Sequence, residues 1–166
     1  MSNSRFKISD QNDIEKIRKN PGSTFYIEED IILKDDFDII EHFYGNINGR
    51  GHTIYVSHKS SSFEGGMINQ NDGILSNLNV VNSYKTNDCI VGGLVSINYG
   101  EIEKCSYCGY IRGDCEDIGG IAGQNFGNIE NCKFSGRISG GYSIGGIAGL
   151  NSINGDIIEC SSKGIV

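Results

Sequence analysis

A unit of 26 to 27 residues recurs four times along this chain of 166 residues, and no other feature restricts the possible folds as strongly. Glycine pairs spaced 27, 27 and 26 residues apart mark the units: Gly65-Gly66, Gly92-Gly93, Gly119-Gly120 and Gly145-Gly146. Matched residues follow each pair in turn: Asn71, Asn98, Asn125 and Asn151, then Leu78, Cys105, Cys132 and Cys160. A period of this length is the signature of a solenoid, in which each unit stacks on the next.

Residues alternate with period 2 after each cysteine position, as in Cys105, Tyr107, Gly109 and Ile111. This alternation predicts strands, about three per unit, joined at turns where glycine and asparagine supply positive φ angles. Stacked units would form a right-handed parallel β-helix, with each strand paired to its equivalent about 4.8 Å away. The pattern leaves open whether Ile121 or Ala122 points inward. The 24 glycines and single proline also disfavour a helical bundle, because interior glycine weakens helices.

The N-terminal part of the chain lacks the repeat. Residues 10–19 predict a short amphipathic helix with Ile14 and Ile17 on one face, and strands follow around residues 25–27 and 31–33. We predict that residues 1–42 form an N-terminal cap over the open end of the stack. Residues 43–166 would then form the coils, beginning with a degenerate one at 43–54, and the whole chain would be one cooperative domain.

Two units carry a resemblance to a known family. Residues 92–105 (GGLVSINYGEIEKC) and 119–132 (GGIAGQNFGNIENC) resemble the GLUG repeat of bacterial β-helix proteins. The helix and the segments 25–33 and 48–54 are similar to the leader that precedes such repeats. The resemblance covers nearly the whole chain and implies the β-helix fold. It implies little about activity, because a shared fold does not transfer a function.

Two sets of matched residues should stack as ladders inside the coils. Asn71, Asn98, Asn125 and Asn151 would hydrogen-bond to one another and to backbone at a corner. Cys105, Cys132 and Cys160 would stack as reduced, buried thiols. Cys105 and Cys108 would face opposite sides of a strand, so we expect no metal and no cofactor. A disulfide between Cys89 and Cys115 on neighbouring coils is a less favoured alternative.

The sequence holds no Ser/His/Asp arrangement, zinc-protease motif or phosphate loop. Its histidines, His42, His52 and His58, lie in the leader or first coil, where a turn or surface role is expected. Glu103 and Glu130 align on adjacent coils about 5 Å apart, the carboxylate spacing of a retaining glycosidase. A solvated acidic face is the favoured interpretation of this pair, so we predict a non-enzymatic protein.

Charge is concentrated in one segment. The chain carries a net charge of -7, and residues 28–41 alone contribute -6. The acidic residues of this segment are Glu28, Glu29, Asp30, Asp35, Asp36, Asp38 and Glu41. Such a patch can attract a basic protein, including a nucleic-acid-binding one, and it disfavours direct binding to nucleic acid. The alternative interpretation is a solvated loop that keeps the domain soluble.

The last unit ends inside a coil with no capping helix. Because open strand edges and apolar residues favour association, we predict a two-fold homodimer through the C-terminal coil. Its interface would include Cys160, Ser162, Gly164, Ile165 and Val166. If the chain is a fragment, this open end is an artefact.

Together these features predict a small inhibitor or immunity-type protein from a bacterium or phage, for example an anti-CRISPR-like inhibitor of a nucleic-acid-binding effector. Since no bilayer-spanning run or export signal is visible, we expect a cytoplasmic location, with secretion or surface display if a longer precursor exists. The alternative function is a glycan-binding or surface-adhesion module, which exposure of Tyr99, Phe126 and Tyr142 on one face would favour. A polysaccharide-active enzyme is the third possibility.

Overall fold

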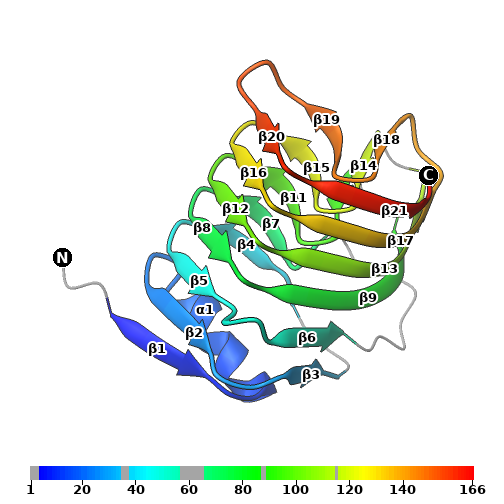
Figure 1. The fold of residues 1–166 in the computed structure, drawn as a ribbon. Helices are drawn as coiled ribbons and strands as arrows, with labels where there is room; N and C mark the ends of the chain where they lie inside the picture. The colour runs from blue at the N-terminus through cyan, green and yellow to red at the C-terminus, as the bar shows by residue number, and fades with distance from the viewer. Residues whose placement is uncertain (1–3, 35–37, 57–65, 87–88, 115) are drawn as a thin grey trace.

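The structure, a computed structural model, describes residues 4–34, 38–56, 66–86, 89–114 and 116–166. The chain winds into an all-β parallel solenoid of about four coils with one short helical segment near its N-terminus (Figure 1). This confirms the fold class predicted from the repeat. Among the described residues, no helix is both long enough and apolar enough to cross a membrane.

Four parallel sheets, here called A to D, run along the stack. Sheet A contains β1 (Arg5–Ile8), β2 (Thr24–Ile27), β5 (Asn46–Asn48), β8 (Ile74–Ser76), β12 (Glu101–Glu103), β16 (Asn128–Glu130) and β20 (Asp156–Ile158). Sheet B contains β3 (Ile31–Leu33), β6 (Thr53–Val56), β9 (Asn79–Thr86), β13 (Ser106–Gly113), β17 (Lys133–Ser139) and β21 (Ser161–Ile165). Sheet C contains β4 (Ile40–Phe43), β7 (Ile68–Asn71), β11 (Val95–Asn98), β15 (Ala122–Asn125) and β19 (Ala148–Asn151). Sheet D contains β10 (Ile90–Gly92), β14 (Asp117–Gly119) and β18 (Ser143–Gly145).

Each of the later coils passes through sheets D, C, A and B in that order, so it has four strands where the alternation predicted about three. The extra strand arises at the glycine pair, where residues 118–122 divide between β14 and β15. Between these strands, a Cβ atom on Gly120 would lie only 2.1 Å from the carbonyl oxygen of Gly146. Ile121 and Ala122 are both fully buried, because the chain turns between two sheets at this point.

The core is a set of stacked inward rows. In sheet A, Ile102 lies opposite Ile129 on the next coil, and both are buried. In sheet B, Tyr107 lies opposite Phe134, with their rings stacked at 6.3 Å. Rows of this kind bury apolar surface that a single coil could not bury alone.

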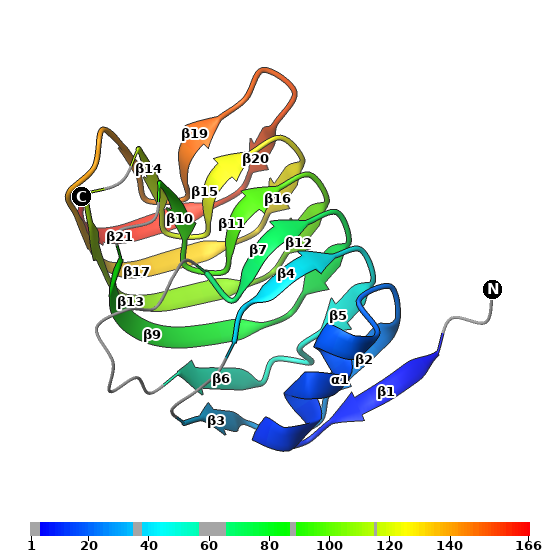
Figure 2. The same ribbon diagram turned by 180° about the vertical axis from the view of Figure 1, so that it is seen from behind.

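The N-terminal segment covers one end of the stack (Figure 2). A 3₁₀ turn, η1 (Gln11–Asp13), leads into α1 (Ile14–Lys19), whose Ile14 and Ile17 are buried. β1 pairs with β2 in sheet A, η1 lies against β3 in sheet B, and α1 lies against β4 in sheet C. The segment therefore follows the path of a coil, which confirms the predicted capping helix.

The coil at the other end is exposed on its inward positions. Ile157 is 38% exposed, whereas Ile129, its partner in the register, is 0% exposed. In sheet B, Ser162 is exposed, whereas Phe134 on the previous coil is buried. The two ends of the solenoid thus differ sharply in how much core they expose.

Candidate functional site

An asparagine ladder holds the corner between sheets C and A. The Nδ2 atoms of Asn71, Asn98 and Asn125 each donate to the Oδ1 atom of the next asparagine at 2.8 Å, ending at Asn151. The first three residues are fully buried, so these hydrogen bonds satisfy amides that would otherwise destabilise the core. The ladder is as predicted. It also fixes the position of the residue that follows each asparagine, and this residue lies on the outside of the corner.

These outer residues and the strands of sheet A line what we call the corner groove, with a volume of about 460 Å³. Asp72 and Tyr99 each follow a ladder asparagine, whereas Glu101, Asn128 and Asp156 form one row at the starts of β12, β16 and β20. The ring of Tyr99, which is half-exposed, stacks on Phe126 at 5.0 Å and 18°.

The corner groove is rich in hydrogen-bond acceptors. It contains three carboxylates, and the Oδ1 atom of Asn128 is buried without a partner in the described part of the chain. Asp72 accepts a hydrogen bond from Gln70 Nε2 at 3.0 Å and also pairs with His42. Acceptors beside an aromatic ring suit a ligand that donates hydrogen bonds or carries positive charge. This site was not predicted from the sequence, because its residues lie about 27 positions apart.

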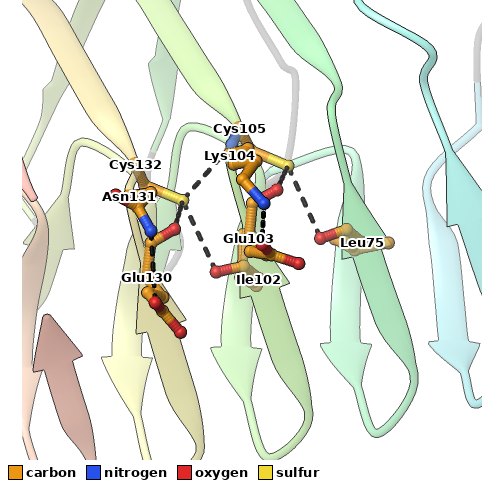
Figure 3. Close-up of polar contacts among 8 residues, drawn as sticks. All are labelled: Leu75, Ile102, Glu103, Lys104, Cys105, Glu130, Asn131 and Cys132. Atoms are coloured by element: carbon orange, nitrogen blue, oxygen red, sulfur yellow. Dashed lines mark hydrogen bonds and ion pairs between the residues drawn. The ribbon is translucent and has the colours of Figure 1, made fainter. Parts of the chain in front are cut away.

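A cysteine ladder holds the next corner, between sheets A and B (Figure 3). The thiols of Cys105, Cys132 and Cys160 each lie within 3.5 to 3.6 Å of a backbone carbonyl oxygen on the preceding coil. The N–H group of Cys105 points at the sulfur of Cys132 at 3.4 Å. The pKa of Cys105 is raised well above its usual range. The hydrogen bond with the Cys132 thiol is the larger cause, and burial is the second. All three are free thiols in this structure.

The other described cysteines, Cys89 and Cys108, lie apart from the ladder. Cys108 is exposed on the opposite face of the strand from Tyr107. Within the described ranges, no group of three His, Cys, Asp or Glu side chains is placed to hold a metal ion. Cys89 is exposed, and Cys115 lies outside the described residues, as does His58.

Glu103 and Glu130 face each other in register on β12 and β16 (Figure 3). Each has a local partner, since Glu103 pairs with Lys104 and Glu130 accepts a hydrogen bond from Asn131 Nδ2 at 3.2 Å. Neither residue lines the corner groove. The pair belongs to the outward face of sheet A.

In the later coils, outward charges of opposite sign separate onto sheets A and B, whereas β1 of sheet A carries Arg5 and Lys7. Strands β12, β16 and β20 carry Glu101, Glu103, Glu130 and Asp156 and contain no lysine or arginine. Strands β9, β13, β17 and β21 contain no acidic residue, and their outward charges are Lys85, Arg112, Lys133, Arg137 and Lys163. We call the first set the acidic face and the second the basic face.

The acidic segment 28–41 is divided by the structure. Glu28, Glu29 and Asp30 follow β2 at the corner between sheets A and B. Glu28 accepts a hydrogen bond from Arg50 Nη1 at 2.7 Å, and the Thr53 N–H group, with His52, lowers the pKa of Asp30.

The other acidic residues of that segment lie elsewhere. Asp38 precedes β4 of sheet C, and Glu41 lies within that strand. Asp38 pairs with Arg18 at 3.1 Å, and Glu41 accepts from Asn69 Nδ2 at 3.2 Å. Asp35 and Asp36 lie outside the described residues. The segment therefore forms two separate acidic groups, with several of its carboxylates already paired.

The predicted dimer residues lie in the last coil. Ser162, Gly164, Ile165 and Val166 are exposed, and Cys160 is half-buried. Tyr142, which is 92% exposed, precedes β18 of sheet D, so it does not share the corner of Tyr99 and Phe126. The structure thus brings together only two of the three aromatic residues considered for sugar contacts.

A comparison with protein families matches residues 114–139 to the GLUG motif. Together with the observed coils, this match identifies the chain as a parallel β-solenoid that carries a GLUG motif, as the resemblance implied. A search of curated proteins and a search of solved structures each found no match.

Proposed function

We propose that this chain is a non-enzymatic, protein-binding solenoid that recognises a basic partner through its acidic face. A small inhibitor or immunity-type protein of a bacterium or phage, acting in the cytoplasm on a nucleic-acid-binding effector in the manner of an anti-CRISPR protein, is one concrete form of this proposal. The observation that carries it is the separation of outward charge between sheets A and B in the later coils.

The geometry supports such binding on physical grounds. Parallel strands place the four carboxylates of the acidic face on rungs about 4.8 Å apart, on a scaffold whose inward side chains are closely stacked. A fixed array of one sign attracts an oppositely charged surface and raises its association rate. The basic face would repel the same partner, so the orientation of docking is also defined.

The test begins with capture of the partner from a bacterial lysate, using the intact chain as bait. The purified partner is then titrated by calorimetry with the wild type and with the variant E101Q/E103Q/E130Q/D156N. We expect affinity to fall by about tenfold or more, because several charge-assisted contacts are lost. The matched control, K133Q/R137Q/K163Q on the basic face, should bind at least as tightly as the wild type. Equal affinity of the wild type and the acidic-face variant would contradict the proposal.

We also propose that two copies associate through their last coils. The supporting observation is the exposure of apolar side chains there, including Ile153 at 99%, Ile165 at 62% and Val166 at 59%. Light scattering over a range of concentrations should show a mass that rises toward that of a dimer. Ile165→Lys should lower the association, whereas Ile32→Lys, an exposed residue of β3, should not. A monomer mass that stays constant with concentration would contradict the proposed association.

The glycan-binding alternative has one observation in its favour. The stacked rings of Tyr99 and Phe126 lie beside the polar corner groove, and aromatic rings offer an apolar platform to sugars. The separate position of Tyr142 removes the third ring from that platform. The charge of the groove distinguishes the two ligand classes.

A further inference from the structure

We propose that the corner groove binds a guanidinium group, so that the basic partner inserts an arginine side chain between the tyrosine and the carboxylates. This inference rests on the proposed function, since it assigns one part of the acidic surface to the reading of a particular side chain. Its site is built from Asp72, Tyr99, Glu101, Asn128 and Asp156.

The acceptors of the groove match the donors of a guanidinium. Glu101, Asn128 and Asp156 lie on successive rungs, so the two carboxylates flank the amide and stand roughly 10 Å apart. The acceptors open to a ligand are therefore the carboxylates, since the Oδ1 atom of Asn128 is itself buried. A guanidinium carries five N–H donors and no acceptor, and none of the described residues that line the groove is a lysine or arginine. The groove is therefore complementary in both charge and hydrogen bonding.

The ring of Tyr99 supplies the second element of recognition. Phe126 stacks on it, which fixes the orientation of the ring while leaving half of the residue exposed. The electron-rich face of a fixed tyrosine attracts a planar cation, and arginine stacks on such rings more effectively than lysine.

An arginine beside the same sheet, in the turn between β5 and β6, is already bound in this way. The guanidinium carbon of Arg50 lies 4.6 Å from the ring centre of Tyr26, and its Nη1 atom donates to Glu28 at 2.7 Å. Tyr26 and Glu28 lie on and just after β2 of sheet A. Tyrosine and carboxylate on this sheet thus hold an arginine within the chain, and the corner groove offers the same two groups to an arginine from outside.

A neutral sugar fits the groove less well. Sugar hydroxyls need donors as well as acceptors, and the donors among the lining side chains are the amides of Asn128 and Asn154 and the hydroxyl of Tyr99. Three carboxylates would remain without a cation, apart from the contact of Asp72 with His42. Surplus acceptors and negative charge favour arginine.

The experiment titrates the full chain with a blocked tetra-arginine peptide, followed by calorimetry and amide NMR. An equivalent peptide with citrulline in place of arginine removes the charge and keeps the shape. We expect the arginine peptide to shift amides of β12, β16 and β20 and to bind about tenfold or more tighter than the citrulline peptide. E101Q/D156N and Tyr99→Leu should each weaken it by a similar factor. Glu159→Gln and Tyr142→Leu, which change exposed residues outside the groove, should leave the affinity unchanged.

Several results would overturn the inference. Equal binding of the arginine peptide to the wild type and E101Q/D156N would do so. So would binding of a neutral tetrasaccharide that depends on Tyr99 while the arginine peptide does not bind, which would support the glycan alternative. If E103Q/E130Q lowers the affinity for the purified partner but E101Q/D156N does not, the inference about the groove is refuted and the proposed function stands. If none of these four substitutions changes the affinity for the partner, the proposed function is refuted. The peptide titration would still test whether the groove binds arginine.

Discussion

Sheets A and B are built from the same coils. In both sheets, the inward residues are alike, whereas the outward residues differ between the two sheets. Inward, both carry buried apolar rows, such as Ile102 with Ile129 and Tyr107 with Phe134. Outward, β12, β16 and β20 of sheet A are acidic, whereas β9, β13, β17 and β21 of sheet B are basic. The repeat therefore specifies the inward residues and leaves the outward ones free. In a solenoid, the outward rows are the place where a binding function can be encoded.

The largest expected effect tests the equivalence of the two inward rows. Ile129→Asp in sheet A and Ile138→Asp in sheet B should each lower the free energy of unfolding by about 3–5 kcal/mol, because each leaves an unpaired charge in the core. Urea denaturation measures the change. Ser135→Asp, which places the same charge on the outside of β17, should change stability by only about 0.5 kcal/mol. A large loss in only one sheet would break the equivalence.

A smaller effect is expected at the asparagine ladder, at the corner between sheets C and A. Asn98→Ala should cost about 3 kcal/mol, because it removes the acceptor of Asn71 and the donor to Asn125 in a buried site. Asn151→Ala serves as the control at the exposed end of the ladder, where about 1 kcal/mol is expected. Thermal unfolding followed by circular dichroism compares the two. Equal losses would mean that burial does not determine the strength of the ladder.

The stability of the chain should be less sensitive to substitutions in the cysteine ladder, at the corner between sheets A and B. Its thiols make weak hydrogen bonds, so Cys132→Ala should lower stability by about 1 kcal/mol, mainly through lost packing. Chemical denaturation of this variant beside Asn98→Ala gives the comparison directly. A cost above that of Asn98→Ala would show that sulfur contacts contribute more than this structure indicates.

Thiol labelling distinguishes the two sides of the strands without changing stability. Cys108 on the outward side should react with a thiol reagent at neutral pH, whereas Cys105 should react only when the chain unfolds. Burial blocks access, and the raised pKa of Cys105 disfavours the reactive thiolate. Peptide mass mapping assigns the labelled sites, with Cys108→Ser as the control. Rapid labelling of Cys105 in the folded chain would be inconsistent with the buried ladder.

Residues that recur in register were predictable from the sequence. The glycine pairs and the two ladders define coils of 26 to 27 residues, because inward packing requires the same residue type at each turn. The fourth sheet was not predictable, since Gly119 and Gly120 hide a change of strand direction within one apolar run. Similarly, the continuous acidic segment around Glu28 and Glu41 divides between two sides of the coil.

The corner groove and the two charged faces were missed for a related reason. Glu101, Asn128 and Asp156 differ in residue type, so they give no repeat signal although they form one row. Reading outward positions at the interval of the repeat, as rows instead of as segments, would have shown both charged faces. Function on a solenoid is thus spread over the sequence even where it is local in space.

The most direct test of the central claim, that the acidic face is the docking surface, is hydrogen exchange of the chain with and without its purified partner. We expect slower exchange in β12, β16 and β20 and in the turn after Asn98, with exchange in β13 and β17 unchanged. A footprint confined to the basic face of sheet B, or to the last coil alone, would contradict it.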